Sequence, residues 1–326
     1  MQFLIYNLFS ILFLFILFIY RDYICLKFKL IDYPGDLSIH QNKALLFGGI
    51  FLISSLILNI LILTSTSMYV GKYFSLFLIF LFFLIAFADD VKNLNPTLRL
   101  FFTISASLIS IYIDPELQIK SLYFYYNNNI YLNNSLIFNY MSSTLCILLF
   151  MNAFNFIDGI NGLASSIGIS FFLYLIIKSP LIFNFYYLFI ISLIFFLYFN
   201  LKYKIFLGDA GNYLISTSIA IILLKENFYQ PSLYFAEEIF LLLLVPGLDL
   251  LRLFIVRISK RSNPFKGDHN HLHHKLLKKF GNFNTIIIYL LLVNLPIYIY
   301  FFTKDFLISL IFITTTAYFI LLKNTS

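Results

Sequence analysis

The chain is built from long apolar runs broken by short polar segments, and this pattern leaves few folds open. Of its 326 residues, 61% are hydrophobic and 11% are charged, far from the composition of water-soluble domains. A helix that crosses a bilayer needs about 20 apolar residues. Runs that approach this length lie at residues 3–20, 44–64, 73–88, 100–113, 142–156, 163–178, 182–200, 211–224, 236–256, 285–302 and 305–322. The sequence therefore predicts one domain over residues 1–326, an all-α integral membrane bundle of about 10 or 11 transmembrane helices.

Basic residues predict the orientation of this bundle, because loops rich in Lys and Arg stay in the cytoplasm. With residue 1 outside and eleven crossings, 17 of the 22 basic residues fall on the inner side. The exceptions are Lys72, Lys120, Lys178, Lys225 and Lys304. The net charge of +7 is then explained by contact with anionic headgroups and substrates, without nucleic acid.

The same orientation places five polar segments together on the cytoplasmic side. They are HQNKALLFGG from His40, DDVKNLNPTLR from Asp89, NAFNFIDGING from Asn152, FLGDAGN from Phe206 and DHNHLHH from Asp268. Ionisable groups are costly beside lipid, so we expect them to converge on a site. The pattern predicts a membrane-embedded enzyme whose chemistry takes place at one face of the bilayer.

Asp89 and Asp90 follow an apolar run directly. Carboxylates at a helix C-terminus oppose the helix dipole, so this pair favours a divalent cation, which takes oxygen ligands. A solvated turn that ends the span is the alternative. Asn95–Pro96 then predicts the start of the return helix, with Arg99 in its first turn.

Two further segments favour binding of a nucleotide. Asn152, Asn155, Asp158 and Asn161 recur every third residue, which gives a polar stripe suited to a nucleoside or sugar edge, or else to hydrogen bonds between helices. Asp209 stands between glycines just before an apolar run. It can cap that helix, or it can hold a metal while the helix N-terminus binds phosphate and Phe206 stacks on a base.

Four of the five histidines lie within six residues, at His269, His271, His273 and His274. Zinc is the obvious ligand, but no cysteine lies nearby and the flanking Arg257, Arg261, Lys266 and Lys275 oppose a cation. Donation of hydrogen bonds to a diphosphate suits the segment better, and an unstructured basic loop remains open.

The span at 236–256 contains Pro246, which interrupts the hydrogen bonds of a helix. Broken helices in membranes line cavities, so we expect Asp249, three residues later, to face one.

These residues, in this order, resemble the polyprenyl-phosphate N-acetylhexosamine-1-phosphate transferases, the WecA/MraY superfamily of glycosyltransferase family 4. The family marks are a D-D pair followed by Pro and a basic residue, N-x-x-N-x-x-D-G-x-x-G-L, F-x-G-D-x-G and a histidine loop, with an earlier D-x-P…H…GG. Here they span about residues 31–280, and the H-L-H-H form with Asp249 before it is similar to the WecA branch. The chain departs from the pattern at Leu37-Ser38, Asn161 and Asn212, which affects the identity of the sugar more than the reaction.

The resemblance implies transfer of a sugar 1-phosphate, an N-acetylhexosamine 1-phosphate, from a UDP-sugar to undecaprenyl phosphate. UMP is released, and the product starts a cell-envelope glycan such as the O-antigen of lipopolysaccharide. The resemblance also implies Mg²⁺ as the cofactor, with Mn²⁺ as a substitute. It implies that the protein lies in the bacterial cytoplasmic membrane with its site facing the cytoplasm, and it is compatible with a homodimer.

The resemblance further implies residue roles. Asp89, Asp90 and Asp158 are the expected catalytic residues, and Asp209 with Asn155 the expected metal ligands. The expected substrate-binding residues are His40, Arg99, Asn152, Asn155, Asn161, Phe206, Asp249, Arg257, His271, His273 and His274.

Three alternatives stay open at this point. Intramembrane polar residues and a broken helix also occur in secondary transporters, although those sites lie near the bilayer midplane between two related halves. The chain could be an inactive scaffold of the same fold. For an enzyme, dolichyl phosphate is the alternative acceptor.

Overall fold

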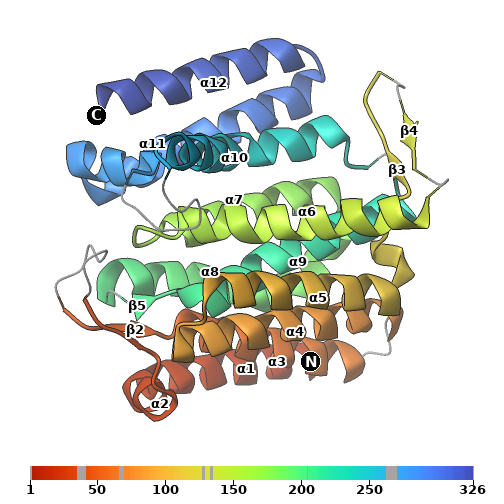
Figure 1. Cartoon of the computed structure of the whole chain (residues 1–326). Helices are drawn as coiled ribbons and strands as arrows, with labels where there is room; N and C mark the ends of the chain where they lie inside the picture. Colours follow the sequence, from red (N-terminus) through yellow and green to blue (C-terminus); the bar gives the residue numbers. More distant parts are fainter. Residues whose placement is uncertain are drawn as a thin grey trace.

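A computed structural model describes residues 2–34, 42–65, 70–126, 129–132, 135–203, 205–231, 233–261 and 270–325. Within these residues the chain forms twelve α-helices that run side by side in a bundle (Figure 1). Their bounds are α1 Gln2–Ile19, α2 Arg21–Phe28, α3 Gly48–Ser65, α4 Val70–Lys92, α5 Pro96–Ile113, α6 Leu136–Ile157, α7 Leu163–Lys178, α8 Leu181–Tyr203, α9 Gly208–Tyr229, α10 Ala236–Ser259, α11 Leu272–Thr303 and α12 Leu307–Asn324. The all-α class is confirmed.

Two small sheets lie at opposite ends of the bundle (Figure 1). At one end β2 (Ala44–Leu46) pairs antiparallel with β1 (Ile31–Asp32) and parallel with β5 (Ile205–Phe206), so that Leu46 lies opposite Phe206. At the other end β3 (Ser121–Leu122) pairs antiparallel with β4 (Ile130–Tyr131), next to the short 3₁₀ helix η1 (Pro115–Leu117). The first sheet holds the segment before α3 beside the segment before α9.

Six of the described helices are long and apolar enough to cross a membrane: α5, α6, residues 186–203 of α8, α10, α11 and α12. A seventh crossing is possible if α1 and α2, bent by 64° between Ile19 and Arg21, act as one span. Each predicted span has a helix, but α2 was not predicted. In addition, α3 begins at Gly48 rather than at residue 44 because residues 44–46 form β2.

The central helix is α9, which is buried along nearly its whole length and packs against α3, α4, α6 and α7. It carries polar residues that a lipid-facing helix would avoid. Two of their hydroxyl groups are satisfied within the helix: Ser216 donates to the carbonyl of Asn212 at 2.7 Å, and Thr217 donates to that of Tyr213 at 2.5 Å. Because other helices surround it, α9 can bring a polar first turn into the bundle without exposing it to lipid.

Helix starts follow local capping chemistry. The side chain of Asn95 accepts a hydrogen bond from the amide of Thr97 at 3.1 Å, and Pro96 is in the first position of α5. The first amides of a helix lack partners within it. Asn95 satisfies the amide of Thr97, and Pro96 has no amide hydrogen to satisfy. This confirms the predicted return helix after the aspartate pair. In contrast, α11 begins at Leu272, well before the predicted residue 285, and is interrupted at Gly281.

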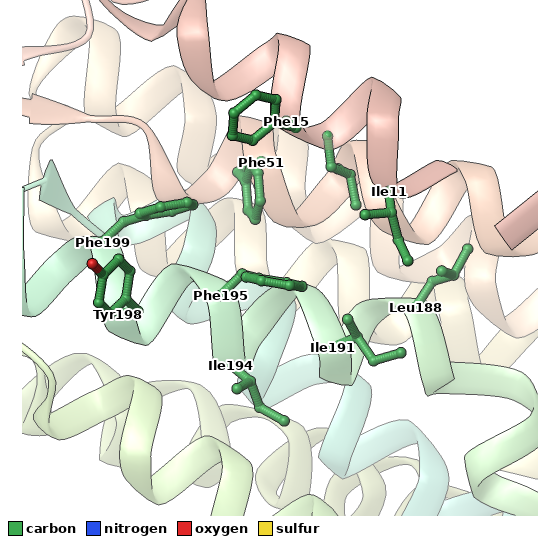
Figure 2. Close-up of a pocket in the computed structure, with 10 residues that line it drawn as sticks. Ile11, Phe15, Phe51, Leu188, Ile191, Ile194, Phe195, Tyr198 and Phe199 are labelled. Atoms are coloured by element: carbon green, nitrogen blue, oxygen red, sulfur yellow. The ribbon is translucent and has the colours of Figure 1, made fainter. Parts of the chain in front are cut away.

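An apolar groove of about 520 Å³ lies between α1, α3 and α8 (Figure 2). Its walls include Phe15 from α1, Phe51 from α3, and Ile191, Phe195 and Phe199 from α8. The groove contains almost no polar surface, and it is separate from the polar segments described next.

Candidate active site

The first part of the site is an acidic cluster where α4, α5 and α9 meet. The guanidinium of Arg99 bridges two carboxylates, donating to Asp89 at 2.7 Å and to Asp209 at 3.1 Å. The second oxygen of Asp89 accepts the amide of Leu94 at 2.7 Å. Residues far apart in the sequence are therefore brought together as predicted, and Asp89 is buried.

Asp90 holds the start of α9. Its two carboxylate oxygens accept the backbone amides of Asp209 at 2.8 Å and Ala210 at 3.0 Å. Gly208 has a φ of +73°, and a side chain there would collide with the Asp90 carboxylate. Asp209 was considered as the cap of this helix, but the carboxylate that accepts the free amides comes from α4 instead. A carboxylate at a helix N-terminus is also favoured by the helix dipole.

The early glycine pair also packs against this turn. The amide of Gly49 donates to the carbonyl of Leu207 at 3.1 Å, and a Cβ at Gly48 would collide with the backbone of Leu207. The approach of α3 to α9 is possible because these positions lack side chains. The end of the HQNKALLFGG segment is thus placed beside the FLGDAGN segment.

Asp158 extends the acidic cluster toward the second part of the site. It follows the last residue of α6, and its carboxylate accepts a hydrogen bond from the side-chain amide of Asn212 in α9 at 2.6 Å. Burial raises the pKa of Asp158 to about 6, partly offset by this hydrogen bond. Burial and the neighbouring charge of Asp90 likewise raise the pKa of Asp209.

The turn after α6 joins the acidic cluster to the histidines. A Cβ at Gly159 would collide with the rings of His273 and His274. His271, just before α11, lies between the rings of Phe156 and His273, with centroids 5.3 Å from each. All three predicted histidines of the described chain are buried. The carboxylates and the histidines therefore form two halves of one site, linked by residues 156–159.

Asp249 is buried beside the histidines and contacts protein groups on both oxygens. One oxygen accepts from Arg252 at 2.8 Å and from Tyr318 at 2.7 Å, and the other lies 2.8 Å from Nδ1 of His271. These contacts make Asp249 a support of His271. They leave it poorly placed for the direct contact with substrate that the sequence predicted.

Five further predicted residues are located as follows. Asn152 donates to the carbonyl of Leu148 in its own helix at 2.8 Å. Asn155 is half-buried, Phe206 is half-buried in β5, and Arg257 is buried in the last turn of α10. Asn161 contributes its carbonyl, which accepts from Asn282 at 3.1 Å. His40, His269 and Lys266 lie outside the described residues.

Three side chains that build the site were not predicted as site residues. Asn212 had been noted only as a departure from the family pattern, although its place in the FLGDAGN segment could have singled it out. Arg252 lies three residues after Asp249 in the same predicted span. Tyr318 lies in an apolar run with no local signal, because only the packing of α12 reveals its partner.

The acidic cluster fits a magnesium ion chemically. Mg²⁺ is usually held by one or two carboxylates, while substrate phosphates and waters complete its shell. Asp209 and its neighbours offer hard oxygen ligands; burial, and then the charge of Asp90, raise the pKa of Asp209, and a cation would offset that charge. Mg²⁺ therefore does not need a site made of protein ligands alone. Among the described residues, one group of three His, Cys, Asp or Glu side chains has its ligand atoms within 4.8 Å of one another, and it consists of Asp249, His271 and His273. At Asp249 both carboxylate oxygens contact protein groups, Arg252 and Tyr318 on one and His271 on the other, which leaves less capacity for a cation than at Asp209, where Arg99 donates to one oxygen.

Comparison with known proteins agrees with this arrangement. Residues 73–227 match the family described as glycosyl transferase family 4. An undecaprenyl-phosphate alpha-N-acetylglucosaminyl 1-phosphate transferase from Thermotoga maritima is 34% identical over 140 residues, which are 42% of this chain and 43% of that protein. Enzymes of the same name from Escherichia coli and Yersinia pestis are 26% and 25% identical over 285 residues, covering 83% of this chain and 74% of each relative.

The described chain is thus a bundle that includes helices apolar enough to cross a membrane, with carboxylates and histidines gathered at one end. Residues 73–227, just under half of the chain, are similar to glycosyl transferase family 4, and the relatives named above are undecaprenyl-phosphate alpha-N-acetylglucosaminyl 1-phosphate transferases.

Proposed function

We propose that this chain transfers a sugar 1-phosphate, an N-acetylhexosamine 1-phosphate, from a UDP-sugar to undecaprenyl phosphate. An oxygen of the lipid phosphate attacks the phosphorus next to the sugar. The bond from that phosphorus to UMP breaks, UMP leaves, and the lipid carries a diphospho-sugar that starts a cell-envelope glycan. The observation that carries the proposal is the link between acidic cluster and histidines through Asp158 and Gly159, in a chain whose relatives bear the name of this activity.

The geometry supports different roles for the four carboxylates. Asp89 and Asp90 each use both oxygens to orient protein groups, Arg99 and the start of α9 respectively. Asp158 accepts one described hydrogen bond and has a raised pKa. We therefore assign to Asp158 the task of taking a proton from the acceptor phosphate, in place of Asp89 or Asp90. The buried histidines, with Arg257, would donate hydrogen bonds to the diphosphate.

Magnesium is part of this proposal, with Asp209 as its principal protein ligand. When bound, the ion would neutralise negative charge on the diphosphate and so allow an anionic acceptor to approach. Asn155, half-buried one turn before Asp158, remains the second predicted ligand, and Mn²⁺ the predicted substitute.

The test of the metal site is Asp209→Asn, which keeps the shape of the side chain and removes its charge. We expect turnover to fall at least about 100-fold, equivalent to about 2.7 kcal/mol, at saturating Mg²⁺. Calorimetry should show the loss of Mg²⁺ binding while the helical circular dichroism is kept. A variant that turns over at near-normal rates would remove Asp209 from the metal site.

We also propose that the site faces the cytoplasm. The basic residues support this orientation, because the cytoplasm supplies the UDP-sugar. Single cysteines replacing the exposed Lys260 and Tyr131, in a chain without Cys25 and Cys146, should react from opposite sides. Labelling of Lys260→Cys by an impermeant reagent applied to intact cells would reverse the assignment.

The direct test of function is release of UMP by purified protein. The protein is offered undecaprenyl phosphate with a panel of UDP-sugars, and the lipid product is identified by mass spectrometry. We expect UMP and a diphospho-sugar lipid in equal amounts, with the highest rate for a UDP-N-acetylhexosamine. Dolichyl phosphate in parallel tests the alternative acceptor. Absence of UMP release with every sugar and both lipids would leave the fold without this activity and favour a scaffold.

A further inference from the structure

One network beside the site lies wholly beyond residues 73–227, which match the family model, and joins α10, α11 and α12. Asp249 lies in α10 three residues after Pro246, and it is 3% exposed. Its first oxygen accepts from Arg252 and Tyr318, at 2.8 and 2.7 Å, and its second lies 2.8 Å from Nδ1 of His271. The amide of Leu272, at the start of α11, lies 3.3 Å from both oxygens. Tyr318 comes from α12, beyond the matched residues 73–227.

The hydroxyl group of Tyr318 closes this network. It donates to Asp249 and accepts from Nε of Arg252 at 2.8 Å. The same guanidinium donates to the carbonyl of Asn270 at 2.7 Å, directly before His271. The carboxylate is thus fixed by α12, and the backbone that carries the histidine is fixed by the arginine. Because the network is buried, loss of one donor would leave an unpaired polar group, which is costly.

The network determines which nitrogen of His271 can meet a substrate. An ionised carboxylate only accepts hydrogen bonds, so the bond to Asp249 requires a proton on Nδ1. Nε2 is then the nitrogen available to a ligand, and carboxylates commonly orient histidines in this way. The rings of Phe156 and His273 on either side further restrict rotation of the imidazole.

We propose that Tyr318, acting with Arg252 through Asp249, is a positioning residue that holds His271 with Nδ1 protonated and Nε2 directed toward the diphosphate of the donor substrate. This inference rests on the proposed function for the identity of the ligand. The orientation of the ring itself can be tested without any transfer reaction.

The experiment compares Tyr318→Phe, which removes one hydroxyl group and keeps the ring, with Tyr300→Phe. Tyr300 is also buried, in α11, and makes no described contact with this network. Kinetics are measured on the full chain with the UDP-sugar varied. We expect kcat/KM for the UDP-sugar to fall about tenfold in Tyr318→Phe, the effect of one buried hydrogen bond, and to stay within twofold of wild type in Tyr300→Phe.

A spectroscopic readout separates positioning from activity. In chain labelled with ¹⁵N-histidine, nitrogen NMR distinguishes a protonated Nδ1 from a protonated Nε2, and His271→Gln identifies the relevant signal. We expect the His271 signal of wild type to show protonated Nδ1, and this signal to broaden or shift in Tyr318→Phe but not in Tyr300→Phe. Asp249→Asn should move it further, because an amide can donate to Nδ1 and so favour the other tautomer.

The outcomes are distinguishable. Wild-type kinetics together with an unchanged His271 signal in Tyr318→Phe would overturn the positioning role while leaving the proposed function intact. If wild type releases no UMP, the proposed function fails, and the nitrogen spectra alone decide how His271 is held. Stoichiometric zinc in purified wild type that is lost in His273→Ala would also overturn the inference, since Asp249, His271 and His273 would then be metal ligands.

Discussion

At the scale of single residues, the carboxylates of the site differ in how many protein donors they meet. Asp90 accepts two backbone amides at 2.8 and 3.0 Å, while Asp158 accepts one side-chain amide from Asn212. Hydrogen bonds to a carboxylate favour its charged form, and burial disfavours it. Asp158 therefore has fewer described donors to its carboxylate than Asp90, and its charge is open to control by pH and by bound substrate.

Transfer should depend on the ionisation of Asp158. Since its pKa is raised by burial to about 6, we expect kcat/KM to fall about tenfold per pH unit below that value. Asn212→Leu removes the hydrogen bond that favours the charged form, so the midpoint of the pH–rate profile should move upward. A midpoint that is unchanged in Asn212→Leu would assign the profile to another group, such as Asp90.

Stability should show the opposite dependence on pH. An unfolded aspartate ionises near pH 4, so between about pH 4 and 6 the folded chain binds the extra proton. The stability associated with neutral Asp158 is lost as the pH rises through about 6. Thermal midpoints measured without substrate or Mg²⁺ should therefore decline across this range, and less so in Asp158→Asn.

Much of the site at this scale could be predicted from the sequence, because each motif carries an ionisable group that lipid would exclude. Asp89, Asp209 and the three described histidines were predicted and are brought together. The separate role of each carboxylate could not be predicted. Whether Asp90 binds a substrate or caps a neighbouring helix depends on how α4 and α9 cross, and no local pattern encodes that crossing.

At the scale of elements, the site depends on turns that bring helix ends into contact. The turn after α6 lies against the histidine rings, and a carboxylate from one helix satisfies the first amides of another at the starts of both α9 and α11. The spans were predictable from hydropathy, because apolar runs identify helices that cross lipid. The bend after α1 and the extension of α11 back to Leu272 were not, since they depend on tertiary contacts of polar residues.

The turn after α6 should tolerate no side chain at Gly159. In Gly159→Ala the new methyl group would collide with the rings of His273 and His274, so we expect kcat/KM to fall at least tenfold. Gly247→Ala is the matched control, because a Cβ there meets no atom within 4 Å. Alanine inside a helix should raise stability by about 0.5–1 kcal/mol. Equal kinetics for the two variants would show that the rings can move without cost.

At the scale of the whole molecule, the end opposite the site is held by buried ion pairs. Glu238 at the start of α10 is fully buried and accepts from Lys178 and Lys304 at distances of 2.6–2.7 Å. Lys225 is paired with Asp114 and Glu116. Three of the five lysines assigned to the outer side by the sequence are therefore neutralised, so they oppose the predicted orientation less than a simple count suggests.

Glu238→Gln should destabilise the fold without changing the chemistry. It leaves two lysines without their counter-charge, and loss of one partner in a buried pair costs about 3–5 kcal/mol. Denaturation followed by circular dichroism should show this loss, while turnover per folded molecule stays normal. Glu116→Gln is the milder control, because Glu116 is partly exposed and Lys225 keeps Asp114. If Glu238→Gln and Glu116→Gln lower the free energy of unfolding equally, the ion pairs of Glu238 contribute no more to stability than that of Glu116.

The contact between Tyr318 and Asp249 has a consequence for biogenesis. Every other residue assigned to the site precedes Tyr318 in the chain, so during synthesis the carboxylates and histidines enter the membrane before the helix that fixes His271. A nascent chain that has inserted eleven helices would already contain the parts of the active site, but they would lack their final alignment. Full activity would therefore be reached only after α12 has packed against α10.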